Sequence, residues 1–183
     1  AKVIKDKIGQ GDAKTVLPTI ACDRYSSYKA LHTLLAFCWA HVRRDFLGLK
    51  IKYPDDRKLC AWADLWLGLI SDLYAVNHPR LRHRYEPPLF EAYQKQLEDV
   101  LDHMQALMRQ SYTKEAQTKQ TESMLEHWPG LTLFVKDLDI PLDNNLAERA
   151  LRTPVVGRKN FYGNHSDRAA EAAAIFYSVL STC

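Results

Sequence analysis

The residue types best suited to phosphate chemistry gather near the carboxyl end of the chain. Asn144, Glu148 and Arg152 are spaced four residues apart, so they share one face if this segment is a helix. Arg158 and Lys159 follow, within the sequence Gly-Arg-Lys-Asn. A carboxylate on a helix followed by a basic loop is a pattern that can hold a metal ion and a polyanion together.

Local signals predict the bounds of this helix. Asp143 can cap its start, and Asn144 or Asn145 can do so if the start lies one or two residues further on. We expect the helix to end just before Pro154, because the residue preceding a proline is disfavoured in the α region.

Each of these residues also has an ordinary structural interpretation. Glu148 and Arg152 could form a surface ion pair worth about 0.2–0.5 kcal/mol. Arg158 and Lys159 could belong to a solvated loop. From the residues alone, both interpretations stay open.

A second carboxylate, Asp23, directly follows the apolar run of residues 15–22. This run predicts a strand, and Pro18 favours an edge or irregular strand over a central one. An aspartate just past a strand end can project its carboxylate into a cleft. It can instead cap the helix expected after it, so two roles are open for Asp23.

Three stretches of the chain together resemble one known family. Residues 23–29 read DRYSSYK, residues 38–46 read CWAHVRRDF, and residues 142–152 read LDNNLAERALR, with VVGRKNFYG two residues later. The same segments occur in this order in the insertion-sequence-sixty-six family of DDE transposases. The chain thus resembles the carboxyl-terminal part of the catalytic domain of that family.

The resemblance implies an α/β fold in a predominantly helical fragment, namely an incomplete ribonuclease-H-like domain with a helical insertion. Asp23 would be the second, and Glu148 the third, of the carboxylates that hold Mg²⁺ (or Mn²⁺). Two such ions about 3.5–4 Å apart assist attack and departure at the phosphodiester when DNA is cut and joined. The first aspartate is expected upstream of Ala1, so the isolated chain is expected to be inactive.

The resemblance also assigns supporting roles. Contacts to DNA phosphates are expected from Arg149, Arg152, Arg158, Lys159, Arg43 and Arg44. Residues expected to orient the metal-binding carboxylates are Asn144, Asn145 and His41. The expected partners are transposon-end and target DNA and further copies of the protein, in the bacterial cytoplasm close to the nucleoid. The alternative is a transposase remnant that binds DNA or another partner without cutting.

Composition sets weaker bounds. The 183 residues carry a net charge of +3, too small by itself to indicate nucleic acid, although Arg80, Arg82, His83 and Arg84 form a basic cluster. The four cysteines lack CxxC spacing, which favours reduced thiols in a cytoplasmic protein. Cys38 and His41 are expected to be structural rather than metal ligands, and no apolar run is expected to span a membrane.

The predicted organisation has three segments: residues 1–54 with Asp23, a helical insertion at 55–140, and residues 141–183 with Glu148. Besides the first strand, residues 34–40 predict a second. Within the insertion, two stripes of apolar residues predict an antiparallel helical hairpin, with a break at Pro79 and at Pro87. A third helix, residues 113–128, is expected to pack peripherally, and Pro129 is expected to start a short fourth one. A last helix is expected from Ser166 or Asp167.

Overall fold

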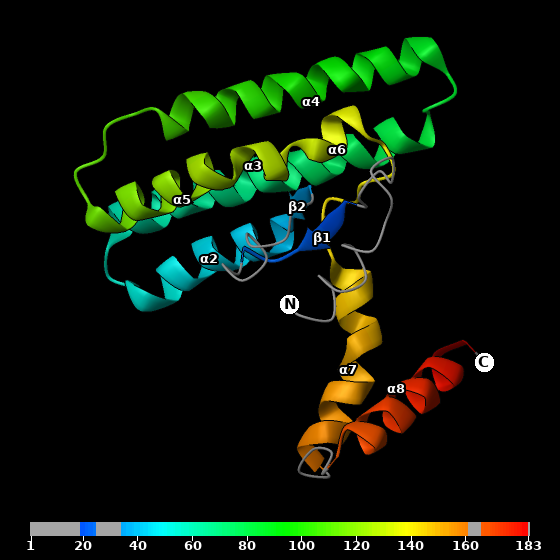
Figure 1. Ribbon diagram of the computed structural model, residues 1–183. Helices are drawn as coiled ribbons and strands as arrows, with labels where there is room; N and C mark the ends of the chain where they lie inside the picture. Colours follow the sequence, from blue (N-terminus) through cyan, green and yellow to red (C-terminus); the bar gives the residue numbers. More distant parts are fainter. Residues whose placement is uncertain (1–18, 25–33, 161–165, 183) are drawn as a thin grey trace. The chain divides into compact units, whose positions relative to one another are not determined.

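The computed structural model describes residues 19–24, 34–160 and 166–182 (Figure 1). The chain forms two compact units, Ala1–Asp143 and Asn144–Cys183, and each is described by itself. The described residues are mostly helical, with a small sheet in the first unit, which confirms the predominantly helical expectation. The expected helix of residues 1–10 lies outside the described residues. The three-segment division and the ribonuclease-H-like assignment stay predictions.

Two short parallel strands form the sheet, β1 (Ile20–Cys22) and β2 (Leu35–Phe37). Their register pairs Ile20 with Leu35 and Cys22 with Phe37. β2 is shorter than predicted, because helix α2 (Trp39–Lys52) begins directly after it. The fully buried Trp39 fixes this transition: its indole donates to the Leu131 carbonyl at 2.8 Å.

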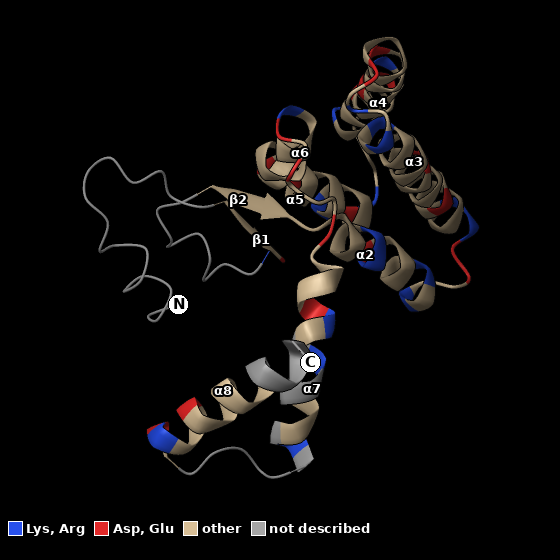
Figure 2. Ribbon diagram, turned by 90° about the vertical axis from the view of Figure 1, so that its right-hand side faces the viewer, with Lys and Arg blue, Asp and Glu red and all other residues tan. Residues whose placement is uncertain are grey.

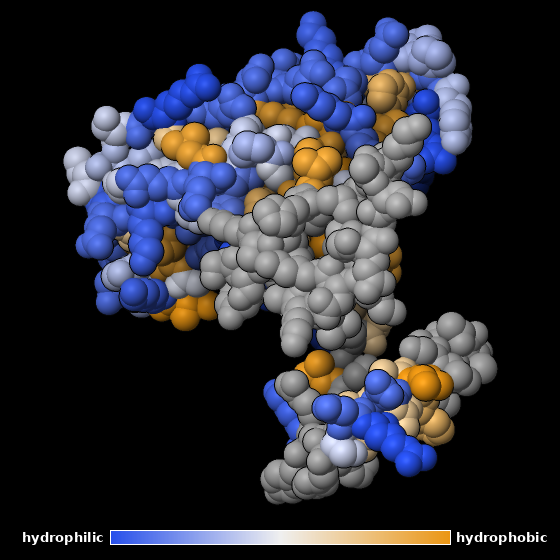
Figure 3. All heavy atoms as spheres, viewed as in Figure 1, coloured by the Kyte–Doolittle hydropathy of each residue, from blue (hydrophilic) through white to orange (hydrophobic). Residues whose placement is uncertain are grey.

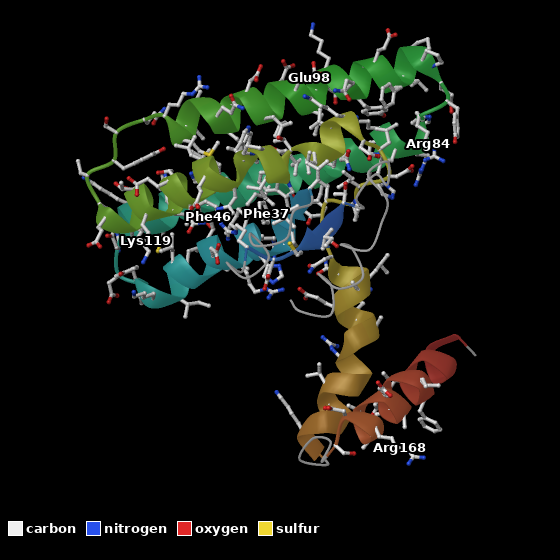
Figure 4. All side chains as sticks on the ribbon, in the orientation of Figure 1. Phe37, Phe46, Arg84, Glu98, Lys119 and Arg168 are labelled. Carbon is white, nitrogen blue, oxygen red and sulfur yellow. The ribbon has the colours of Figure 1, made fainter. Side chains whose placement is uncertain are left out.

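The core of the first unit lies between α2, α3 (Arg57–Arg82) and α4 (Pro87–Met108). In Figure 1, α3 and α4 run antiparallel and side by side, as the predicted hairpin requires. The predicted stripes supply much of this core, and Trp66, Leu73, Leu97 and Met104 are all fully buried. The ring of Phe46 stacks on that of Trp66 at 5.3 Å between centroids, so α2 shares the core of the hairpin. Figure 4 labels the buried Phe46 on α2 and the exposed side chains of Glu98 on α4 and Lys119 on α5.

The predicted break at Pro79 is wrong, because α3 continues through it to Arg82. Pro79 lies in the last turn, where a missing N–H costs a single helical bond. The turn is closed by the amide of His83, which donates to the carbonyl of Pro79 at 2.9 Å. At the other end, the carboxylate of Asp56 caps α3 by accepting from the amide of Leu59 at 3.0 Å.

Helix α3 is also long and apolar enough, by length and composition, to cross a membrane. No other helix of the described residues passes that test, and we had expected none. Trp66, Ile70 and Leu73 are completely buried in the core with α2 and α4. We therefore interpret α3 as the core helix of a helical bundle.

Helix α5 (Glu115–Leu131) is not peripheral, contrary to the sequence expectation. It packs against β2 as well as α2 and α4, and it buries Met124 and Leu131 completely or nearly so. Pro129 lies inside α5 and does not start a new helix; the short α6 (Leu133–Lys136) follows after Thr132.

Gly130 marks the point where α5 comes closest to the sheet. A Cβ at this position would lie 2.5 Å from the Leu35 carbonyl oxygen and 2.5 Å from the ring of Phe37. The Leu35 carbonyl is part of the backbone of β2 and cannot move by itself. Only glycine therefore fits at position 130 without a shift of α5 or β2.

We expect Gly130→Ala to lower the free energy of unfolding by about 1–3 kcal/mol, the usual cost of overpacking a core. The matched control is Gly68→Ala in α3, where a Cβ would meet nothing within 4 Å. That substitution should stabilise the helix by up to about 1 kcal/mol, since alanine is the better helix former. Urea unfolding of both variants measures the difference, and equal midpoints would contradict the close approach of α5 to β2.

The second unit contains α7 (Asn145–Asn160) and α8 (Asp167–Thr182). α7 does not end before Pro154, and the predicted basic loop of residues 157–160 is the last turn of this helix. A Cβ at Gly157 would overlap the hydroxyl of Tyr177, so α7 and α8 approach closely there. α8 begins at Asp167, within the predicted range, and Ser166 caps it, with its hydroxyl accepting from the amide of Ala169 at 3.2 Å. Figure 3 shows apolar side chains at the surface of this unit, where Phe176 is 64% exposed.

Candidate active site

The two strands end at the same edge of the sheet because they are parallel, and Asp23 lies at this edge. It directly follows β1 and is half-buried, which confirms the predicted position after a strand. Cys38 follows β2, and its amide donates to the Cys22 carbonyl at 3.0 Å. Burial, with smaller contributions from Asp23 and Cys38, raises the pKa of the Cys22 thiol to about 11. Cys22 is 4% exposed, so its thiol is a buried neighbour of Asp23.

The first turn of α2 carries the other candidates of this edge. The amide of His41 donates to the Cys38 carbonyl at 3.2 Å, and the side chain of His41 is half-buried. Arg43 and Arg44 are exposed on the same helix, as a phosphate contact requires. Within residues 19–24, 34–160 and 166–182, no three His, Cys, Asp or Glu side chains gather closely enough to hold a metal ion.

The segment that leads into α7 is fixed beside the strand ends. The amide of Trp39, one residue after Cys38, donates to the Leu142 carbonyl at 2.9 Å, and Leu142 is buried in the core. The next residue, Asp143, accepts a hydrogen bond from the Tyr74 hydroxyl at 3.1 Å. The carboxylate that we considered as a helix cap is thus bonded to α3.

Sequence reasoning missed Tyr74. It lies beside the apolar stripe of α3 rather than on it, so spacing alone gives no signal. The available clue was chemical: a tyrosine next to the apolar stripe of a helix usually needs a hydrogen-bond partner for its hydroxyl when it is buried.

Helix α7 begins at Asn145, and the Asn144 carbonyl accepts the first helical bond from the amide of Glu148 at 3.0 Å. Asn144 is therefore the residue that precedes the helix. Glu148 is half-buried in the first turn, where the helix dipole favours a negative charge. Asn144 and Asn145 are half-buried beside it.

The basic candidates of α7 are placed along its length. Arg149, Arg152 and Lys159 are exposed, and Figure 2 shows charged residues along this helix. Arg158 lies in its last turn, but its side chain lies outside the described residues. Asp23 belongs to the first compact unit and Glu148 to the second, so their approach to one another stays a prediction.

The basic cluster of residues 80–84 is divided in the structure. Arg80 is 1% exposed and bonded inside the first unit, so it is no part of a DNA-binding surface. Arg82 and Arg84 are exposed, and Arg84 lies over the ring of Tyr85.

Comparison with known proteins decides the family. The model of the transposase IS66 family matches residues 4–172, which include the strand-end aspartate and the helix of Glu148. The chain belongs to this family. Two relatives of this IS66-family chain, both from Sinorhizobium fredii (strain NBRC 101917 / NGR234), are the uncharacterized proteins y4hP and y4jD.

The chain is 31% identical to y4hP over 172 residues, which cover 85% of the chain and 30% of y4hP. It is 28% identical to y4jD over 179 residues, covering 94% of the chain and 33% of y4jD. The IS66-family chain thus spans about a third of the length of these relatives. No solved structure matches it.

Proposed function

We propose that this IS66-family chain is part of a DDE-type transposase that cuts and joins DNA, with Asp23 and Glu148 as two of its metal-binding carboxylates. The observation that carries the proposal is the anchoring of residues 142 and 143 beside the strand ends, through Trp39 and Tyr74. Asp23 lies at this same edge, and the chain enters the helix of Glu148 directly from it.

The length of the connection supports this assignment. Glu148 follows Asp143 by five residues, so the chain keeps their Cα atoms within about 17 Å of each other even when fully extended. The helical first turn shortens this span further, because each helical residue advances by about 1.5 Å. A carboxylate so close in sequence to the anchored segment can serve the same site as Asp23.

The donor set fits Mg²⁺ or Mn²⁺. Asp23 and Glu148 offer carboxylate oxygens, which these ions prefer, and both side chains are half-buried and so still reach solvent. When bound, the ions supply activation of the attacking oxygen and stabilisation of the leaving oxygen.

The remaining roles follow from this assignment. We propose that Asn144, Asn145 and His41 orient the carboxylates and that exposed arginines and lysines of α2 and α7 bind the phosphates of transposon-end and target DNA. A third carboxylate and the rest of a ribonuclease-H-like sheet would come from the longer protein. We further propose that the complete transposase acts as a homo-oligomer in the cytoplasm, close to the nucleoid.

The test uses the full-length protein and a labelled duplex that carries a transposon end. Wild type is expected to cleave the duplex with Mg²⁺ or Mn²⁺ and to stop when the ions are chelated. Asp23→Asn should reduce cleavage to background, because the amide is a far weaker ligand than the carboxylate. Asp99→Asn, an exposed position on α4, makes the same chemical change outside the site and should cleave as wild type does. Undiminished cleavage by Asp23→Asn would exclude Asp23 from the site.

A further inference from the structure

Tyr74 connects the helical hairpin to the start of the helix that carries Glu148. Its hydroxyl donates to Oδ2 of Asp143 at 3.1 Å, across a separation of 69 residues. Tyr74 is half-buried on α3, close to the fully buried Leu73. Burial, then the negative charge of Asp143, raises the pKa of the Tyr74 hydroxyl well above its ordinary value. The hydroxyl is therefore a neutral donor to the carboxylate at neutral pH.

Two consecutive residues are fixed at this point. The backbone of Leu142 is held by the amide of Trp39, and its side chain is 8% exposed in the core. The side chain of Asp143 is held by Tyr74. The next carbonyl, that of Asn144, already accepts the first helical bond from Glu148. Along the chain, Asn144 alone separates Asp143 from Asn145, the first residue of α7.

We propose that Tyr74 is a positioning residue for the reaction, which holds Asp143 and thereby fixes the point from which the helix of Glu148 starts. The inference rests on the proposed function, since it gives Tyr74 a part in placing the carboxylate of Glu148. It also gives the hairpin of α3 and α4 a role beyond forming a core, because Tyr74 lies on α3 and holds Asp143.

Loss of the Tyr74 hydroxyl has a definite expected consequence. Asp143 would lose a hydrogen bond to its charged carboxylate, and such bonds are about twice as strong as neutral ones. Without this bond the side chain of Asp143 would be held less firmly, and the first turn of α7 would fray more often. Because a displacement of about 1 Å at a reacting group can cost about 100-fold in rate, a small loosening here is enough to slow cleavage.

The experiment compares Tyr74→Phe with Tyr112→Phe in the full-length protein. Tyr112 is also half-buried, and its hydroxyl donates to the Leu107 carbonyl at 2.7 Å, so each variant loses one hydrogen bond of a tyrosine. Hydrogen exchange of the amides of residues 148–150, which make the first helical bonds of α7, is measured first, without DNA or metal. Exchange there should rise several-fold in Tyr74→Phe and stay at the wild-type rate in Tyr112→Phe.

The second readout is cleavage as a function of Mg²⁺ concentration. Tyr74→Phe should cleave about 10- to 100-fold more slowly and need more Mg²⁺ for half-maximal activity, because a misplaced carboxylate binds the ion less well. Tyr112→Phe should show the wild-type Mg²⁺ dependence. In a double-mutant cycle with Asp143→Ala, the Tyr74 substitution should add no further loss, since Tyr74 acts through Asp143.

The outcomes separate this inference from the proposed function. Unchanged exchange at residues 148–150 in Tyr74→Phe overturns the positioning role, whatever the protein catalyses. Equal effects of the two tyrosine variants on Mg²⁺ dependence also overturn it, because they would reflect general stability. A wild-type protein that fails to cleave, with exchange still raised in Tyr74→Phe, contradicts the proposed reaction and leaves the anchoring of α7 in place.

Discussion

Glu148→Gln in the full-length protein is expected to abolish strand cleavage and to leave DNA affinity equal or slightly higher. The substitution keeps the size of the side chain but removes the charge that would hold Mg²⁺. It also removes the repulsion between that carboxylate and the DNA phosphates, which is why binding should not weaken. A cleavage assay with Mg²⁺ and a binding titration on the same duplex measure the two properties separately.

Matched variants make this result specific. Glu171→Gln changes an exposed carboxylate of α8 in the same compact unit and should leave cleavage unchanged. Lys159→Ala, and likewise Arg158→Ala, should weaken binding to all DNA sequences and lower the slope of log affinity against log salt by about 1, the value for one phosphate contact. Wild-type cleavage by Glu148→Gln would show that the helix of Glu148 has no catalytic part.

Sequence patterns predicted the elements with strong local signals. Asp23 follows a strand, α8 begins at Asp167 directly after the capping Ser166, and the apolar stripe through Trp66 and Leu73 is in the core of the hairpin. In each case the local signal and the packing agree. A capping side chain accepts from a backbone amide that has no acceptor within the helix. A stripe of apolar residues with helical spacing lies on one face of the helix, so the whole stripe can pack against the same neighbour.

The helix ends were predicted less well because prolines were given too much weight. Pro79, Pro129 and Pro154 all lie inside helices. Pro79 and Pro129 fall in the last turns of α3 and α5, where the missing amide removes one bond while tertiary contacts hold the turn. For α5, those contacts include the approach of Gly130 to the sheet, which no spacing rule could have indicated.

The depth of α5 was underestimated because only its apolar residues were counted. Thr121 and His127 are also buried. The Thr121 hydroxyl donates to the Gln117 carbonyl at 3.0 Å, and Nδ1 of His127 lies 2.7 Å from the Ser123 carbonyl oxygen. A polar side chain that bonds to its own helix in this way can be buried at little cost, so the contacting face of α5 is wider than its apolar stripe.

The candidate site was also predicted only in part from the sequence. The sequence identified Asp23 and Glu148 through their motifs, but it gave no indication that Tyr74 anchors Asp143. That contact joins residues 69 positions apart and depends on how α3 packs beside the strand ends. Long-range hydrogen bonds of this kind are set by tertiary packing, which a single sequence does not display.

The sequence neighbours of Arg80 suggest an exposed basic residue, but the structure shows a buried one. Its substitution has the largest effect on stability that we expect for this chain. In the sequence it belongs to a basic cluster with Arg82, yet its guanidinium is buried and joins three helices. Nε donates to Oε1 of Gln94 at 2.6 Å, and Nη1 donates to Oδ1 of Asn77 at 3.0 Å. Nη2 donates to the Val135 carbonyl at 2.7 Å. Burial lowers the pKa of Arg80, but an arginine remains charged in a folded protein.

Arg80→Ala is therefore expected to lower the free energy of unfolding by about 3–5 kcal/mol, since it leaves several buried or partly buried acceptors unsatisfied at about 1–3 kcal/mol each. Arg80→Lys should recover little of this loss, because an ammonium cannot reproduce the planar fork of donors. Arg82→Ala, an exposed position two residues away, should change stability by no more than about 0.5 kcal/mol. Urea unfolding of the three variants tests the assignment. If Arg80→Ala is as stable as Arg82→Ala, Arg80 does not hold α3, α4 and α6 together.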